Sequence, residues 1–322
     1  MDKLLLNSYL SIYIFSEVIT LILSLMVLFI TVKIVLKWDF NSNAKEQYRL
    51  EKSLYLGSIL ALFLFVAKLI LLVYLVFALD AISIYIPGAM CAAGVVSANG
   101  YGMVLLGVKF LTIFMLLLYL FLEKYDVESK YYPILRAREV VLIVAIVLSL
   151  IEVYLDYSYF YNIDIDAPVS CCSTLYGTLE GQNPLPFNLN IYTLLIVFAL
   201  LFIALISALL LELDILTLIA APLFIYISYY SVVYFFGTYI YQLPTHKCPF
   251  CMMQKEYNYI GYLVWGTLFF GVSLGAVWAI VKRWLKKDYK EVKRYAIILL
   301  TLFVAINCSY ILIYYIKNGV LL

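Results

Sequence analysis

Residues 190–211, NIYTLLIVFALLFIALISALLL, contain no charged side chain. A helix needs about 20 apolar residues to cross a bilayer, so this run predicts a transmembrane helix. Similar runs recur along the chain, which predicts an all-α membrane protein with about eight transmembrane helices. The predicted spans are 8–36, 54–79, 102–123, 139–161, 190–211, 215–241, 257–281 and 295–316. The composition, 66% hydrophobic and 13% charged, excludes a soluble globular protein, which is usually about 45–50% apolar.

The basic residues are unevenly placed between these spans. They follow the first, third and seventh spans, at Lys37, Lys45, Arg49, Lys52, Lys124, Lys130, Arg136, Arg138 and through the run 282–294. The connections 80–101 and 162–189 contain no Lys or Arg. Because Lys and Arg mark the cytoplasmic side, we expect both termini to be extracytoplasmic, in a bacterial inner membrane. The turn 212–214 is cytoplasmic by alternation, yet it carries no basic residue.

The predicted spans divide into two four-helix bundles, residues 1–162 and 190–322, joined by an extracytoplasmic loop at 163–189. A short internal similarity suggests two parallel repeats. Pro87 stands four residues before Cys91, as Pro244 stands four before Cys248. Each of these segments precedes the third helix of its bundle.

The cysteines follow the predicted topology. Five of the six fall in connections expected on the extracytoplasmic side: Cys91, Cys171, Cys172, Cys248 and Cys251. In a bacterium that side is the oxidising one, where cysteines are expected to be paired, redox-active or metal-bound. Cys308 lies within the last span, and we expect it to be a small buried apolar residue.

The segment Cys248-Pro249-Phe250-Cys251 contains the only Cys-x-x-Cys of the chain. We expect it at the start of a helix, with Pro249 at the first helical position and Cys251 one turn further on. The positive end of the helix, together with His246 and Lys247, would then favour a thiolate at Cys248. Cys251 would be the resolving thiol, and Cys171 or Cys172 would exchange with the pair. The alternative is a structural disulfide in an outer loop.

This segment resembles the active dithiol of the DsbB and vitamin K epoxide reductase type of membrane thiol oxidoreductases, over about a dozen residues. The resemblance implies a Cys-x-x-Cys at the outer mouth of a helix, a second cysteine pair and a quinone beside the dithiol. In DsbB-type proteins an Arg lies one turn beyond the second cysteine, where this chain has Lys255. The quinone would then lie among Tyr257, Tyr259 and Trp265. The chain departs from the family in its eight predicted helices, in Lys255 and in Cys91, which makes the number of cysteines in the predicted outer loops odd.

Two other functions fit the same residues. A soft-metal protein, binding or transporting Cu(I), would use thiolate and thioether ligands. Its ligands would come from Cys91, His246, Cys248, Cys251 and Met252. A structural subunit of a larger membrane complex would use the cysteines as plain disulfides. Covalent haem is not expected, because the histidine precedes the Cys-x-x-Cys.

The expected partners follow from these alternatives. They are the lipid bilayer and either an extracytoplasmic thiol protein or a soft-metal carrier. The chain has no Gly-rich phosphate loop, so no nucleotide partner is expected, and no nucleic acid. The basic run 282–294 is expected to lie on anionic lipid headgroups.

Charged residues also occur inside the predicted spans of the first bundle. Five of them lie away from the ends of the spans: Glu17, Lys68, Lys109, Glu152 and Asp156. A charge at the centre of a membrane helix costs roughly 2.5–3.5 kcal/mol on insertion scales, so such residues normally face the bundle interior and pair. We therefore expect Glu152 or Asp156 to approach Lys68 or Lys109. The network serves either to hold the helices together or as a proton or ligand path.

Overall fold

The computed structural model describes residues 7–40, 44–129, 131–165, 167–169, 185 and 189–322. The chain divides into two compact units, residues 1–169 and 170–322. The described residues form helices and no β-strand. Eight of these helices are long and apolar enough to cross a membrane. The prediction of an all-α membrane protein with eight spans is confirmed.

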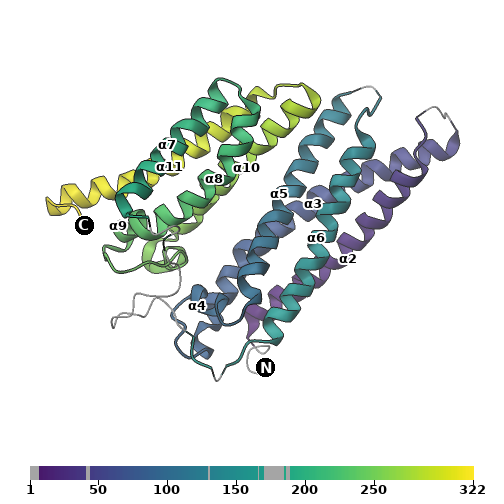
Figure 1. Ribbon diagram of the computed structural model, residues 1–322. Coiled ribbons are helices and arrows are strands. Elements are labelled where there is room, and N and C mark those ends of the chain that lie inside the picture. The colour runs from purple at the N-terminus through teal and green to yellow at the C-terminus, as the bar shows by residue number, and fades with distance from the viewer. Residues whose placement is uncertain (1–6, 41–43, 130, 166, 170–184, 186–188) are drawn as a thin grey trace. The chain divides into compact units, whose positions relative to one another are not determined.

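Four long helices form the first unit: α2 (Ser8–Lys37), α3 (Lys45–Ile82), α5 (Tyr101–Glu128) and α6 (Leu135–Tyr161). Figure 1 shows them running alongside one another as a bundle. Helix α2 packs against α3 and α6, and α5 packs against the same two helices, which closes the ring. A short 3-10 helix, η1 (Ser83–Tyr85), and the short α4 (Ala92–Val96) connect α3 to α5.

An apolar layer crosses the middle of the first unit. It includes Val27, Leu64, Leu116, Leu142 and Ile146, which are fully buried and pack against one another. One residue comes from each of α2, α3 and α5 and two from α6, so the layer ties all four helices together.

The second unit has four long helices in the same cyclic order: α7 (Ile191–Leu210), α8 (Asp214–Ser231), α10 (Ile260–Leu285) and α11 (Lys290–Asn318). A π-helical turn, η4 (Val232–Phe236), and α9 (Gly237–Tyr241) continue α8. Aromatic rings fill the centre. The Phe224 ring lies 5.5 Å from that of Phe198 and 6.3 Å from that of Phe303. All three side chains are buried.

Several helices extend beyond the predicted apolar runs. Helix α3 begins at Lys45 rather than at residue 54, and α11 begins at Lys290 rather than at residue 295. The added turns contain Lys, Arg, Glu and Gln. These residues are good helix formers, so the end of the apolar run does not mark the end of the helix.

The acidic turn between α7 and α8 binds basic residues from another part of the second unit. Glu212 forms ion pairs with Lys282, at 3.1 Å, and with Lys293. Asp214 lies 3.4 Å from Arg283. The turn therefore lies against the basic segment at the α10–α11 connection, which supplies the positive charge that the turn itself lacks.

Candidate dithiol site and buried charge network

The Cys-x-x-Cys does not lie at the N-terminus of a long helix. Pro249 and Phe250 form a bend, and Cys251 begins a three-residue 3-10 helix, η5 (Cys251–Met253). A second 3-10 helix, η6 (Lys255–Tyr257), follows. Asn258 and Tyr259 then adopt left-handed backbone angles, with φ of 52° and 57°, before α10 begins at Ile260. The prediction of Pro249 at the first helical position, with Cys251 one turn into the helix, is wrong.

Two aromatic side chains hold the motif in place. The Tyr241 hydroxyl, at the end of α9, donates to the carbonyl oxygen of Cys248 and accepts from the Met252 N–H at 3.1 Å. The Trp265 indole N–H, from α10, donates to the carbonyl oxygen of Pro249 at 2.9 Å. The backbone on both sides of the dithiol is therefore fixed by neighbouring helices.

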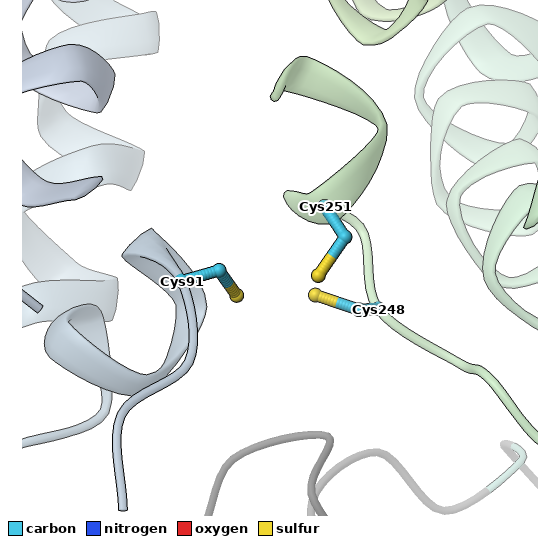
Figure 2. Close-up of side chains that lie close together, drawn as sticks. All are labelled: Cys91, Cys248 and Cys251. Atoms are coloured by element: carbon cyan, nitrogen blue, oxygen red, sulfur yellow. The ribbon is translucent and has the colours of Figure 1, made fainter. Parts of the chain in front are cut away.

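The sulfur atoms of Cys248 and Cys251 lie within 4.8 Å of one another, without a disulfide between them. Figure 2 shows the two sulfur atoms side by side. The Phe250 N–H donates to Cys248 Sγ at 3.4 Å. A hydrogen bond to the charged form stabilises it, so this N–H favours a thiolate at Cys248 in place of the expected helix terminus.

Aromatic rings surround the pair. The Tyr241 ring lies 4.2 Å from the His246 ring and 4.9 Å from the Tyr257 ring. Burial raises the pKa of the Tyr257 phenol, and the charges of Cys251, Glu256 and Cys248 raise it further. Tyr257 is therefore close enough to the thiols for their charge to affect its pKa.

The remaining residues predicted to bind a quinone are placed differently. Trp265 is half-buried, and its N–H is engaged by Pro249. The side chains of Lys255 and Tyr259 are exposed. The predicted set therefore contributes two residues to the immediate surroundings of the motif, Tyr257 and Trp265.

Residues considered as metal ligands are spread over different environments. Met252 is fully buried, and a Cβ added at Gly261 would lie 2.6 Å from its Cγ, so Met252 packs against the start of α10. Among the described residues, His246 Nε2 has no hydrogen-bond partner. Cys91 lies in the first unit, as the residue preceding α4. Cys171 and Cys172 lie outside the described residues.

Cys308 is exposed on the surface of α11. The expectation that it is buried inside the protein is therefore wrong.

The five charged residues expected to pair, Glu17, Lys68, Lys109, Glu152 and Asp156, come together in the interior of the first unit, each at most 6% exposed. Lys68 Nζ lies 2.7 Å from Glu17 Oε2 and 3.0 Å from Glu152 Oε1. Lys109 Nζ lies 3.1 Å from Glu17 Oε1, 2.7 Å from Glu152 Oε1 and 2.9 Å from Asp156 Oδ2. The expected pairing is present: Glu152 contacts both lysines, and Asp156 contacts Lys109.

A second buried cluster lies on the other side of the apolar layer, and the sequence analysis missed it. Arg138 Nε lies 3.3 Å from Asp126 Oδ2 and 3.2 Å from Glu139 Oε1, and all three residues are buried. In the sequence, Arg138 is interpreted only as a sign of the cytoplasmic side. The adjacent acid Glu139, at the edge of the apolar run, was the available sign that it is paired.

No protein-family model, curated protein or solved structure matches this chain. The contacts within each unit are therefore the basis for assigning a function.

Proposed function

We propose that this protein is an integral membrane thiol–disulfide oxidoreductase with Cys248 and Cys251 as its redox pair. The observation that supports it is the approach of the two sulfurs to within 4.8 Å, in a segment fixed by Tyr241 and Trp265. Closing the disulfide requires the two sulfurs to approach to an S–S distance of about 2.05 Å.

Cys248 is the nucleophile in this proposal, because the Phe250 N–H points at its sulfur. Its thiolate attacks a substrate disulfide, which forms a mixed disulfide and releases one substrate thiolate. The Cys251 thiolate then attacks Cys248 Sγ, which forms the Cys248–Cys251 disulfide and releases the second substrate thiolate. In the opposite direction, a substrate dithiol is oxidised and the pair is reduced.

A quinone is the electron acceptor we propose for the reduced pair. Forming the disulfide from two thiols releases two electrons and two protons, which convert a quinone to a quinol. Tyr257 and Trp265 lie next to the motif and offer aromatic faces for the ring, whereas Lys255 is exposed at the surface. We place the dithiol on the extracytoplasmic side of a bacterial inner membrane, where its partner is a thiol protein. The absence of Lys and Arg from the connection 162–189 supports that orientation.

We also propose that the two units are parallel repeats with extracytoplasmic termini. Both units have the same cyclic helix order, with short helices before the third long helix. The third helix is entered through Asn-x-x-Gly in each case, residues 99–102 and 258–261. Gly102 and Gly261 are each the second residue of that helix, and each faces the segment before it. An added Cβ would lie 2.1 Å from Val96 O and 2.6 Å from Met252 Cγ, respectively.

The test is to trap the mixed disulfide with oxidised glutathione. We expect the Cys251→Ser variant to accumulate one glutathione on Cys248, because the resolving thiol is missing. The parent protein should instead form the internal disulfide and release reduced glutathione. The Cys248→Ser variant, as the matched control, should react more slowly. Equal reaction at both cysteines, or none at either, would contradict the assigned roles.

Copper analysis separates this proposal from the soft-metal alternative. Within the second unit, the metal-binding atoms that come together are the two sulfurs, since Met252 is used in helix packing. We expect the purified protein to contain no stoichiometric copper and to form the disulfide when treated with a soluble quinone. Stoichiometric copper with thiols that remain reduced in air would replace the redox proposal with the metal one.

A further inference from the structure

The charge network of the first unit contains more acids than bases. Glu17, Glu152 and Asp156 face Lys68 and Lys109, so three carboxyl groups are opposed by two ammonium groups. All five side chains are almost fully buried. If every group were ionised, one negative charge would be left uncompensated inside a membrane protein. One bound proton makes the network neutral, which is the cheaper state in a low-dielectric interior.

The hydrogen bonds of Tyr13 place that proton. Its hydroxyl oxygen lies 2.8 Å from Asp156 Oδ1 and 3.1 Å from Glu17 Oε1. A phenol has one proton, so it can donate to only one of these two oxygens. Two ionised carboxylates would leave the other contact without a hydrogen. A proton on either Asp156 Oδ1 or Glu17 Oε1 would satisfy both contacts. Glu17 Oε1 also accepts from Lys109 at 3.1 Å, whereas the Lys109 contact of Asp156 is to its other oxygen, Oδ2. The proton therefore belongs on Asp156 Oδ1, which donates to Tyr13 while Tyr13 donates to Glu17.

A buried oxygen of Glu152 also supports one bound proton in the network. Among the described residues, Glu152 Oε2 is buried and has no hydrogen-bond partner, whereas Oε1 accepts from both lysines. A fully ionised network would leave a charged oxygen buried without a donor, which is costly. Oε2 is thus a second oxygen on which a proton can reside, one helical turn from Asp156 on the same face of α6.

We propose that this network is a proton-binding site that holds one exchangeable proton, with Asp156 as its resting holder and Glu152 as the second position. The three carboxylates are also close enough to hold a metal ion. However, the two ammonium groups already make five contacts to four of the six carboxylate oxygens. They therefore supply the positive charge that a cation would bring. The proposal does not depend on the thiol chemistry of the second unit.

The surroundings of the site determine where the proton exchanges. Thr20 donates to Glu17 Oε2 at 3.0 Å, and Ser24 and Ser149 lie 3.3 Å apart one turn further along α2 and α6. The apolar layer with Val27 and Leu142 then separates the site from the second cluster of Asp126, Arg138 and Glu139. We therefore expect exchange from the end of the unit where α6 ends at Tyr161.

Infrared spectroscopy of the full-length protein tests the site. A protonated buried carboxyl group gives a carbonyl stretching band that shifts in D2O when the proton exchanges. We expect this band in the wild type and its loss in Asp156→Asn, which preserves the shape of the side chain. In Tyr13→Phe, which leaves every charge in place, the band should move to higher frequency because the acid loses its acceptor. Glu212→Gln, which alters an ion-paired acid in the second unit, should leave the band unchanged.

Three other results would contradict the proposed proton-binding site or its assignment to Asp156. Loss of the band in Glu152→Gln but not in Asp156→Asn would overturn Asp156 as the holder. A wild-type spectrum without the band would overturn the site. So would a band that keeps its full intensity in Asp156→Asn, Glu152→Gln and Glu17→Gln, because the proton would then lie elsewhere.

Discussion

The two units fill the same kind of helical frame with opposite chemistry. In the first unit, five charged residues and Tyr13 meet between α2, α3, α5 and α6. In the second, the centre is made by Phe198, Phe224 and Phe303. The two thiols of the candidate dithiol site lie instead in the connection before α10. The comparison shows that the helix order does not determine where a unit holds its polar chemistry.

The difference predicts different responses to substitution. A charge network is satisfied only when each member is present, because a buried charge without its partner is costly. An aromatic centre depends on shape and volume, so a substitution of similar size is tolerated. The following substitutions compare the two units on this basis.

The largest effect is expected for Lys109→Met in the first unit. Lys109 contacts all three carboxyl groups, so its loss leaves them opposed by Lys68 alone. Breaking a buried pair by removing one partner costs about 3–5 kcal/mol. Thermal unfolding in detergent should show a large decrease in the unfolding temperature. The double variant Lys109→Met/Asp156→Asn should be more stable than Lys109→Met; an additive loss would mean that the residues act independently.

The next largest loss of stability is expected for glycine substitutions in the first turns of α5 and α10. Gly102→Ala would place a Cβ 2.1 Å from the Val96 carbonyl oxygen, and Gly261→Ala would place one 2.6 Å from Met252 Cγ. Overpacking of this kind costs about 1–3 kcal/mol, and we expect the larger loss at Gly102 because a backbone atom cannot rotate away. Only Gly261→Ala should alter the reaction rate of Cys248, since Met252 N–H binds Tyr241.

Gly107 provides the control for both, because an added Cβ there meets nothing within 4 Å. Gly107→Ala should be neutral, or stabilising by about 0.5–1 kcal/mol through helix propensity. If all three variants unfold at the same temperature, the close approach at the two helix entrances does not limit stability.

A smaller effect is expected in the aromatic centre. Phe224→Leu keeps an apolar side chain between Phe198 and Phe303 and should cost less than about 1.5 kcal/mol. The loss, measured by the same thermal unfolding, should not change with pH, because Phe224 packs against Phe198 and Phe303, which are not ionisable. A loss as large as that of Lys109→Met would remove the contrast between the two units.

The fold was predictable to a large degree, because long apolar runs have few alternatives in a membrane protein. The pairing of Lys68 and Lys109 with acids was also predictable, since a charge at that depth requires a partner. The ends of α3 and α11 were not, because helix-forming polar residues continue the helix past the apolar run.

The sequence predicted which residues form the dithiol site but not where they lie in the fold. Proximity of Cys248 and Cys251 follows from their spacing, but their place in the fold does not. Asn258 and Tyr259, which both adopt a left-handed backbone conformation, separate the motif from α10. A Tyr rarely adopts this conformation, so the sequence does not predict it. The role of Tyr241 as a clamp depends on a contact between α9 and the motif, which no local pattern encodes.

The smallest effect concerns an exposed ion pair that makes the second unit sensitive to acid. Hydrogen bonds from Lys293 and Lys282 lower the pKa of the Glu212 carboxyl to about 2 from its ordinary 4.5. Because the folded-state pKa is lowered, the stabilisation is complete above about pH 4.5 and is lost as the pH falls toward 2. The unfolding temperature of the wild type should therefore decrease through this range.

The unfolding temperature of Glu212→Gln should be lower than that of the wild type at neutral pH and should change less with pH. Glu256→Gln, at an exposed acid in η6, should follow the wild type. Since salt screens exposed charges, the difference between wild type and Glu212→Gln should shrink in 1 M salt. A difference that persists unchanged in high salt and at low pH would show that Glu212 acts through the left-handed backbone of its turn, with φ of 59°, and not through its charge.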